Sequence, residues 1–231
     1  MVWIGRRAPD ADIARKIARL SAHGPAPVYM QADAADWEAL EQAYRKIRSS
    51  LGPVNGVVHA AMDLLDRSLA QMDEARFAAG LRAKVDVSVR LAQVFAGERL
   101  DFMLFFSSLQ SFSKMPGQAN YAAGCTFEDA LAHQMAQIAP WPVRTVNWGY
   151  WGSVGAVATE AHRTRMAREG IGSIEPGEAM DVLERLLGGD CAQVAFVKFN
   201  GKRPMPAGIG SETVSFSEEE APSLLGSLDL G

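Results

Sequence analysis

The sequence predicts an α/β protein built on a doubly wound parallel sheet. Short runs of β-branched or aromatic residues alternate with longer segments of helical periodicity, which is the pattern of βαβ units. The run at residues 101–107 is hydrophobic almost throughout, as expected of a parallel strand that helices cover on both faces. Of the 231 residues, 48% are hydrophobic and 22% are charged, which is ordinary for a globular protein with a sizeable core.

Each expected element follows from local composition or periodicity. The helices repeat apolar residues every three or four positions, as Ile13, Ile17 and Leu20 do in the first, and Asp36 is expected to cap the second. Strands are expected at residues 2–5, 27–31, 54–60, 101–107, 143–148 and 193–199. Helices are expected at residues 10–23, 36–51, 73–95, 122–137 and 176–187, with a shorter helix within residues 152–172.

The strand at residues 2–5 leads into Arg6 and Arg7 rather than into a Gly-rich turn. We therefore assign it as the second strand of the sheet, and expect the first strand and its Gly-rich loop to be absent, an N-terminal truncation. In a 3-2-1-4-5 strand order the missing strand would lie between residues 2–5 and 54–60. Its loss would leave backbone groups unpaired, so the isolated chain is expected to be a fragment of marginal stability.

Charge and cysteine content exclude several classes of protein. The net charge of -4 and the pI near 5.6 argue against nucleic acid or an anionic membrane as the main partner. Cys125 and Cys191 do not make a disulfide framework, and we expect no metal site, no signal peptide and a cytoplasmic location. Residues 1–200 are expected to form one domain, and residues 201–231, rich in Gly, Pro, Ser and Glu, an interdomain linker or tail.

Ligands of a doubly wound sheet bind beyond the carboxyl ends of its strands, which selects several candidates. Arg6 suits the 2′-phosphate of a dinucleotide, and is otherwise a solvated surface arginine. Asp33 is placed to accept from an adenine amine. Ala60 and Ala61 are small enough to let the backbone pass close to a cofactor, whereas His59 before them is better explained as structural.

Ser108 and Tyr121 are candidates for the chemistry. Ser108 follows the buried strand, and Tyr121 stands thirteen residues later at the start of a helix. Reduction of a carbonyl by hydride needs a proton donor at the developing alkoxide and a second hydrogen bond that polarises the C=O. A tyrosine and a serine hydroxyl supply these two functions, and an ammonium group nearby lowers the tyrosine pKa because its charge favours the phenolate.

Five motifs extend this pattern, in an order and spacing far more specific than any one of them. They are residues 59–61 (HAA), 83–85 (AKV), 106–108 (FSS), 116–123 (PGQANYAA) and 147–151 (NWGYW). Up to about residue 200 the chain resembles the ketoreductase domains of modular polyketide synthases, members of the short-chain dehydrogenase/reductase superfamily with a Rossmann-like fold. The resemblance implies NADPH-dependent reduction of a β-ketoacyl chain carried by an acyl carrier protein, with other synthase domains as neighbours in the same polypeptide.

The resemblance also implies roles for single residues. Ser108 and Tyr121 become the catalytic pair, and Lys84 supplies the ammonium group, although a solvated helix lysine is the alternative. Other short-chain dehydrogenases carry the lysine four residues after the tyrosine, where this chain has Cys125. The synthase domains usually have Asn there as part of a relay around the lysine, and a thiol donates and accepts poorly, so Cys125 is otherwise a small core residue. We expect activity despite it, and this variant resembles ketoreductases of trans-acyltransferase synthases.

Other segments gain expected roles from the same resemblance. The backbone at Asn147, Gly149 and Trp151 is implied to run beside the nicotinamide carboxamide. Residues 152–172 are expected to form a mobile lid over the substrate. Its arginines either meet a phosphopantetheine phosphate or an acidic carrier protein, or form a solvated face; they are Arg163, Arg165 and Arg168.

The product configuration and the function class can also be addressed. Leu64-Leu65-Asp66 retains one Asp of a family motif and Ser113 replaces a Trp eight residues before the tyrosine, which favours the B-type, (R)-hydroxyl product. One alternative is a non-catalytic structural domain of the synthase, which Cys125 and the absent loop support. Another is a free-standing dehydrogenase acting on a small ketone, against which the position of Lys84 and the linker-like tail count.

Overall fold

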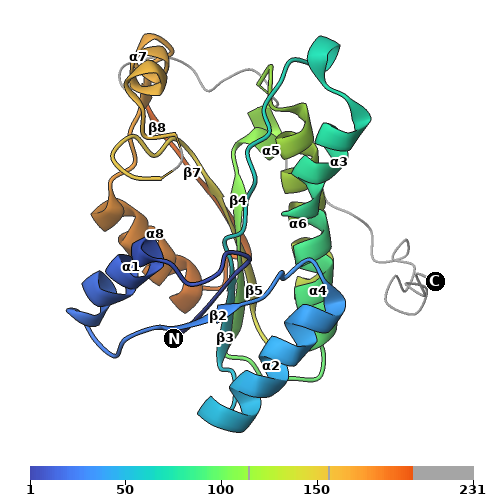
Figure 1. Ribbon diagram of the computed structural model, residues 1–231. Helices are drawn as coiled ribbons and strands as arrows, with labels where there is room; N and C mark the ends of the chain where they lie inside the picture. The colour runs from blue at the N-terminus through green and yellow to red at the C-terminus, as the bar shows by residue number, and fades with distance from the viewer. Residues whose placement is uncertain (114, 156, 200–231) are drawn as a thin grey trace.

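The computed structural model describes residues 1–113, 115–155 and 157–199, and it has the expected α/β architecture (Figure 1). Four parallel strands form a sheet in the order β3-β4-β5-β7. These strands are Gly56–His59, Phe102–Ser108, Val143–Trp148 and Gln193–Phe196. The predicted linker or tail at residues 201–231 lies outside the described residues.

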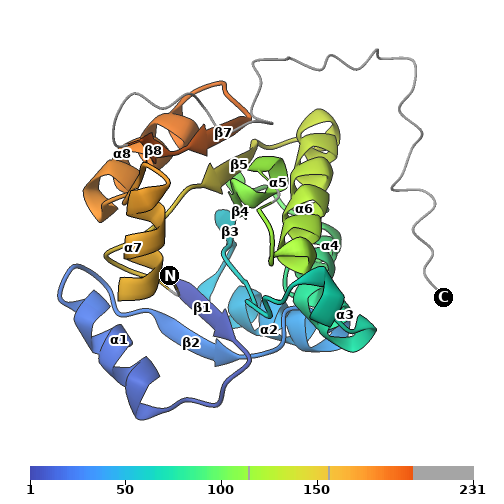
Figure 2. The same cartoon turned by 90° about the horizontal axis from the view of Figure 1, so that it is seen from above.

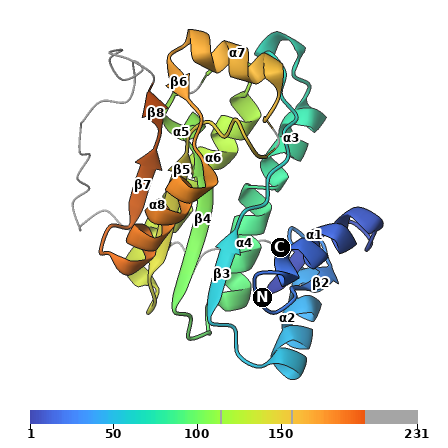
Figure 3. The same ribbon diagram turned by 90° about the vertical axis from the view of Figure 1, so that its left-hand side faces the viewer.

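Helices cover both faces of this sheet. On one face lie α2 (Trp37–Leu51), α4 (Val85–Phe95) and α6 (Ala119–Ile138), and on the other lies α8 (Pro176–Gly188) (Figures 1 and 3). The remaining elements are shorter and lie mainly at the ends of the strands. They are η1 (Leu69–Gln71), α3 (Glu74–Arg82), α5 (Gln110–Ser113), α7 (Glu160–Arg168), β6 (Ile171–Gly172) and β8 (Lys198–Phe199).

The side chains of β4 alternate between two hydrophobic cores, because successive residues of a strand point to opposite faces. Met103 and Phe105 are fully buried in the core beneath α2, α4 and α6. Leu104 enters the second core with Val146, beneath α8. The continuous hydrophobicity of this strand therefore has the predicted cause, burial on both faces.

A separate two-stranded parallel sheet pairs β1 (Val2–Gly5) with β2 (Val28–Gln31), and α1 (Ala11–Ser21) connects them. Within the described residues no strand is hydrogen-bonded between β1 and β3, which agrees with the expected absence of the first strand. Figure 2 shows β1 and β2 at the end of the structure next to β3, with β7 at the opposite end. Asp36 caps α2 as predicted, since its Oδ1 accepts from the Ala39 amide at 2.8 Å.

Most predicted boundaries differ from the structure by one or two residues, and three differ in a way that matters for the site. The long helix expected at residues 73–95 is two helices, α3 and α4, with Lys84 at their junction. The strand expected at residues 193–199 is divided into β7 and β8. Helix α6 begins at Ala119, three residues before the expected start, so Tyr121 lies in its first turn. No helix in the described part of the chain is long and apolar enough to cross a membrane.

Candidate active site

A cavity of about 980 Å³ lies at the carboxyl ends of the parallel strands. Ser108 at the end of β4, Tyr121 in the first turn of α6 and Lys84 at the α3–α4 junction all line it. The loops after β3 and β5 and one side of α7 form the other walls. The structure thus brings together three of the four catalytic residues that the sequence predicts, from three separate elements.

Tyr121 is held in the protonated form. Burial raises the pKa of Tyr121 above its usual value, Cys125 and Glu128 raise it further, and a hydrogen bond with Ser108 opposes them. The expected lowering of this pKa by a nearby ammonium group is therefore not what the structure shows: the net shift of the pKa is upward, with burial as its largest cause. A protonated hydroxyl is the form that a proton donor needs.

Ser108 is oriented by the turn into α5. The backbone amide of Gln110 donates to its Oγ at 3.2 Å. This contact uses an acceptor position of the hydroxyl and leaves its hydrogen available to donate. Ser108 and Tyr121 therefore offer two hydroxyl groups to the same cavity.

Lys84 is a buried lysine rather than a solvated one, with 1% of its surface exposed. Its Nζ donates to the carbonyl of Phe106 at 2.6 Å and lies 3.0 Å from Oε2 of Glu128. Gly124 of α6 makes this burial possible, since a Cβ at that position would lie 2.9 Å from the Cβ of Lys84. The helix break at Lys84 and the close approach of α6 together hold the ammonium group under the cavity.

Cys125 lies one helical turn after Tyr121 and is fully buried. Burial raises the pKa of its thiol to about 12, and the charge of Lys84 opposes this rise. A side-chain hydrogen bond links Cys125 to Tyr121. Cys125 therefore contacts Tyr121 from inside the protein, although it does not line the cavity.

Three of the candidate cofactor-binding residues line the cavity: Ala60, Gly149 and Trp151. Gly149 donates from its amide to the carbonyl of Phe196 at 2.8 Å, and a Cβ on Gly149 would lie 2.8 Å from that same oxygen. Only glycine fits at this point, because the backbone after β5 lies directly against β7. The ring of Trp151 packs edge-on against Trp148, with centroids 5.1 Å apart.

The side chain of Asn147 is engaged inside the fold and does not line the cavity. Its Nδ2 donates to Oδ2 of Asp129 at 2.8 Å and to Oγ of Ser111 at 3.0 Å, and its Oδ1 accepts from Gln193 at 2.8 Å. These contacts join β5 to α6, α5 and β7. The side chain of Asn147 thus has a structural role, which leaves only its backbone for the predicted contact.

Arg6, Asp33 and Ala61 also lie outside the cavity lining. The guanidinium of Arg6 is 3.3 Å from the carboxylate of Asp63, and its side chain is 61% exposed. Asp33 accepts from a backbone amide in its own turn and forms an ion pair with Arg82 at 3.1 Å. The structure therefore gives Asp33 an ion-pair partner that the sequence did not indicate, while Arg6 is largely exposed after the end of β1 and pairs with Asp63.

Helix α7 carries the three arginines of the predicted lid, and Arg165 lines the cavity together with His162. Arg163 and Arg165 form ion pairs with Glu160 and Glu169 of the same segment. All the residues of α7 are exposed or half-buried, so the helix covers the cavity without being packed into a core.

Sequence reasoning missed Glu128, which is 0% exposed and lies next to Lys84. A signal for it does exist in the sequence. Tyr121, Cys125 and Glu128 stand at positions i, i+4 and i+7 of one helix, which is the spacing of a single face. A glutamate on the same helix face as the candidate tyrosine and the buried Cys125 is not expected to be solvent-exposed.

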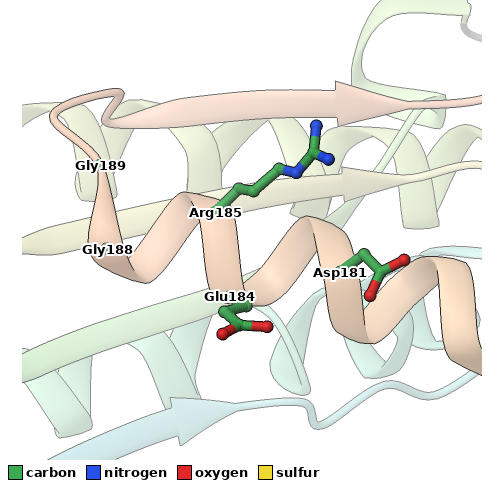
Figure 4. Close-up of a pocket in the computed structure, with 5 residues that line it drawn as sticks. All are labelled: Asp181, Glu184, Arg185, Gly188 and Gly189. Carbon is green, nitrogen blue, oxygen red and sulfur yellow. The ribbon is translucent and has the colours of Figure 1, made fainter.

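A second hollow, of about 550 Å³, lies along the last turns of α8 (Figure 4). Its lining consists of Asp181, Glu184, Arg185, Gly188 and Gly189. In Figure 4 Arg185 extends toward the neighbouring strand while Glu184 points away from it. These charged side chains are exposed and do not converge, so the hollow offers no constellation for chemistry.

Comparison with known proteins identifies the family of this chain. The KR domain family matches residues 1–153. The polyketide synthases PksN of Bacillus subtilis and ThaG of Burkholderia thailandensis are 50% identical over 219 residues and 54% identical over 197 residues, covering 95% and 85% of this chain. The chain spans only 4% of the length of each of these relatives.

Solved structures show the same relationship. An A1-type ketoreductase superposes with a TM-score of 0.79 at 29% identity, over 86% of this chain and 42% of that one. A ketoreductase domain from the bacillaene assembly line gives a TM-score of 0.77 at 25% identity, over 85% of this chain and 48% of that one. The chain therefore belongs to the KR family, the ketoreductase domains of polyketide synthases, which are oxidoreductases of the short-chain dehydrogenase/reductase type.

Proposed function

We propose that this domain uses NADPH to reduce a β-ketoacyl thioester, carried by an acyl carrier protein, to the β-hydroxyacyl form. The observation that carries the proposal is the convergence of Ser108 and Tyr121 on one cavity, with the buried ammonium of Lys84 beneath them. This is the set of groups that reduction of a carbonyl requires. The high identity to polyketide synthases supports a carrier-bound substrate and neighbouring synthase domains as partners.

We assign each residue of the cavity a separate role in the reduction of the ketone. Tyr121 gives the proton from its Oη to the ketone oxygen as negative charge develops there. Ser108 donates a hydrogen bond from its Oγ to the same oxygen, which polarises the C=O and stabilises the alkoxide. Lys84 supplies positive charge below the pair and stabilises the phenolate that Tyr121 becomes. Helix α7, above the cavity, limits the access of water during these steps.

The cavity fits the nicotinamide end of a dinucleotide. Ala60, Gly117 and Gly149 contribute little or no side chain to its lining, and a larger residue at Gly149 would strike the carbonyl of Phe196. When bound, NADPH supplies the hydride. Gly149, Trp151 and the backbone of Asn147 would hold its nicotinamide, and the exposed guanidinium of Arg6 would hold the 2′-phosphate, for which a planar bidentate donor is suited.

The proposed product is the (R)-hydroxyl thioester. Leu64, Asp66 and Ser113 all line the cavity. Asp66 is fixed there because its Oδ2 accepts from Nε2 of Gln118 at 2.7 Å. Chiral chromatography of the product tests this configuration. We further propose a cytoplasmic synthase of the trans-acyltransferase type, on the similarity of the segment around Cys125.

The deciding experiment measures NADPH oxidation with a β-ketoacyl N-acetylcysteamine thioester, in the domain completed with a first strand and a Gly-rich loop. Tyr121→Phe is expected to lower kcat about 10²- to 10⁴-fold, since it removes a general acid without changing the volume of the ring. Tyr150→Phe is the matched comparison, because Tyr150 is the other tyrosine that lines the cavity. A larger loss in Tyr150→Phe would transfer the role to Tyr150, and wild-type protein without NADPH oxidation would reject the proposed function.

A further inference from the structure

Lys84 belongs to a buried group of charges that extends away from the cavity. Glu128 has no exposed surface, and both its carboxylate oxygens lie close to Nζ of Lys84, at 3.0 and 3.3 Å. On its other side Oε1 of Glu128 lies 3.3 Å from Nε2 of His59, which is 2% exposed. Three ionisable side chains from β3, α6 and the α3–α4 junction thus meet inside the core.

The hydrogen bonds of His59 define which way its ring faces. Its Nδ1 accepts from the amide of Ala61 at 3.3 Å, so the proton of the neutral ring is on Nε2. Burial, with a smaller contribution from the charge of Lys84, lowers the pKa of His59 to about 3. His59 is therefore neutral, and its Nε2 lies 3.3 Å from the carboxylate of Glu128 without the alignment of a hydrogen bond.

A buried lysine needs a partner, since an unpaired ammonium in the core is strongly destabilising. The carbonyl of Phe106 supplies one acceptor, and the second must come from α6. Cys125 lies on the same face of α6, but a thiol is a weak acceptor and cannot hold an ammonium group in place. Glu128, one turn further along that face, has a side chain that does reach Nζ.

We propose that Glu128 is the positioning residue for Lys84. In this arrangement the side chain of Glu128 fixes the position of the ammonium group beneath Tyr121. Above its raised pKa, the carboxylate also balances the charge of Lys84 in the core. Glu128 acts through Lys84 and does not touch the substrate. The inference rests on the proposed reductase function, which it deepens by naming the group that sets up its lysine.

The surroundings of Glu128 determine the pKa of its carboxyl group. The groups that face it are Lys84, His59, Cys125, Asp129 and Tyr121. Burial raises the pKa of Glu128 to about 8, Lys84 opposes this rise and Asp129 adds to it. The charge of Glu128 in turn raises the pKa of Tyr121. Removal of that charge should therefore make the Tyr121 hydroxyl more acidic.

Glu128→Gln tests the proposal, because it removes the charge and keeps the size. We expect kcat to fall roughly ten- to a hundredfold with little change in the KM of the thioester, since the groups that touch the substrate remain. In the direction of alcohol oxidation, where Tyr121 accepts the proton, the rise of rate with pH should move to lower pH. Glu128→Asp, which retains the charge on a shorter side chain, should recover part of the lost kcat.

Asp129→Asn is the matched control. Asp129 is the next residue of α6, and its carboxylate is held by Asn147 rather than by Lys84. This variant removes a neighbouring carboxylate. Because Asp129 only contributes to the pKa of Glu128 and does not pair with Lys84, the pH dependence of oxidation should move less than in Glu128→Gln. An equal shift in Asp129→Asn and Glu128→Gln, or a change in KM alone for Glu128→Gln, would overturn the assignment of Glu128.

A measurement on wild-type protein separates this inference from the proposed function. NMR of the Lys84 Nζ and Glu128 Cδ resonances requires neither turnover nor folding of a variant. The Lys84 resonance should shift as Glu128 ionises, because ionisation of Glu128 changes the partner of the ammonium group. A Lys84 resonance that ignores the ionisation of Glu128 would overturn the positioning role even in an active enzyme. Coupled resonances in protein that does not oxidise NADPH would reject the reductase function and keep the Lys84–Glu128 pairing.

Discussion

The two parallel sheets of this domain differ in how deeply they are buried. In the catalytic sheet, formed by β3, β4, β5 and β7, Met103, Phe105 and Val146 have no exposed surface. In the N-terminal unit, formed by β1, α1 and β2, every residue of β1 is half-buried and Ile13 is the one buried residue of α1. The groups proposed for proton transfer are thus anchored in a rigid core. The arginine proposed for the cofactor phosphate stands on a lightly packed unit.

The contrast teaches that the proposed cofactor binding and the proposed proton transfer depend on different parts of this fold. Ser108, Tyr121 and Lys84 owe their positions to β4, α6 and the α3–α4 junction, which pack into the main core. Arg6 owes its position to a strand that pairs only with β2 among the described residues. Changes in the catalytic sheet should therefore alter stability and kcat, and changes in the N-terminal unit should alter cofactor affinity.

The largest expected difference between the two regions is in core packing. Met103→Ala should lower the free energy of unfolding by about 2–5 kcal/mol, because Met103 is fully buried in β4. Met30→Ala, in the half-buried β2, should cost about 1 kcal/mol or less, since fewer buried contacts are lost. Urea denaturation measures both values. Equal costs would show that the N-terminal unit is packed as tightly as the catalytic sheet.

The pH dependence of stability should originate in the catalytic sheet, where His59 and Glu128 lie. The pKa of His59 falls from 6.5 to about 3 on folding, so the unfolded chain binds more protons and stability decreases as pH falls from 6.5 toward 3. The pKa of Glu128 rises from 4.5 to about 8, so the folded chain binds more protons and stability decreases as pH rises from 4.5 to 8. The two effects oppose each other between 4.5 and 6.5.

These two groups should give a stability plateau between pH 4.5 and 6.5, with a fall of about 1.4 kcal/mol per pH unit on either side. Unfolding free energies across this range measure it. Glu128→Gln should remove the fall on the alkaline side, and His59→Gln should remove the fall on the acid side. A slope that both variants retain would mean that other groups control it.

Arg6→Ala should separate the two regions kinetically. Loss of the contact with the 2′-phosphate is expected to raise the KM for NADPH about tenfold, equivalent to about 1.4 kcal/mol, and to leave kcat and the KM for NADH unchanged. Arg7→Ala is the control, because Arg7 is equally exposed and forms ion pairs with Asp10 and Asp12. A fall in kcat for Arg6→Ala would contradict the separation of binding from chemistry.

The smallest expected effect concerns helix caps. Asp73 accepts from the Arg76 amide at 2.7 Å at the start of α3, and Asp10 accepts from the Ile13 amide at 2.8 Å at the start of α1. Asp73→Ala should lower the global free energy of unfolding by about 1 kcal/mol. Asp10→Ala should instead speed hydrogen exchange in α1 with little change in global stability, because α1 is free to open locally. Similar global losses in both variants would show that α1 unfolds only with the rest.

Much of the fold could be predicted from the sequence because its signals are local. The strand at residues 143–148 was predicted with its observed bounds, since a β-branched run between Pro142 and Gly149 leaves little choice. The break at Lys84 could not be predicted, because the residues on both sides have helical periodicity. The break depends on tertiary contacts with Phe106 and Glu128, which no local pattern encodes.

The site shows the same division. Ser108 and Tyr121 were predicted from their spacing, and the structure brings them together. The ion pair between Asp33 and Arg82 was not predicted, because the two residues are far apart in sequence and meet only in the folded chain. Glu128 was missed for a related reason: a charged side chain is normally exposed, and its burial follows from the lysine that comes to lie beside it.

Glu128 and Asp129 are neighbours in sequence, and successive helical residues point about 100° apart around the axis. One carboxylate therefore holds Lys84 while the next holds Asn147, in two separate directions. Any rotation of α6 about its own axis would break one contact or the other. The two contacts thus fix the rotation of α6 about its axis. Since Tyr121 lies two turns upstream on the Glu128 face, they also fix the direction in which the phenol hydroxyl points.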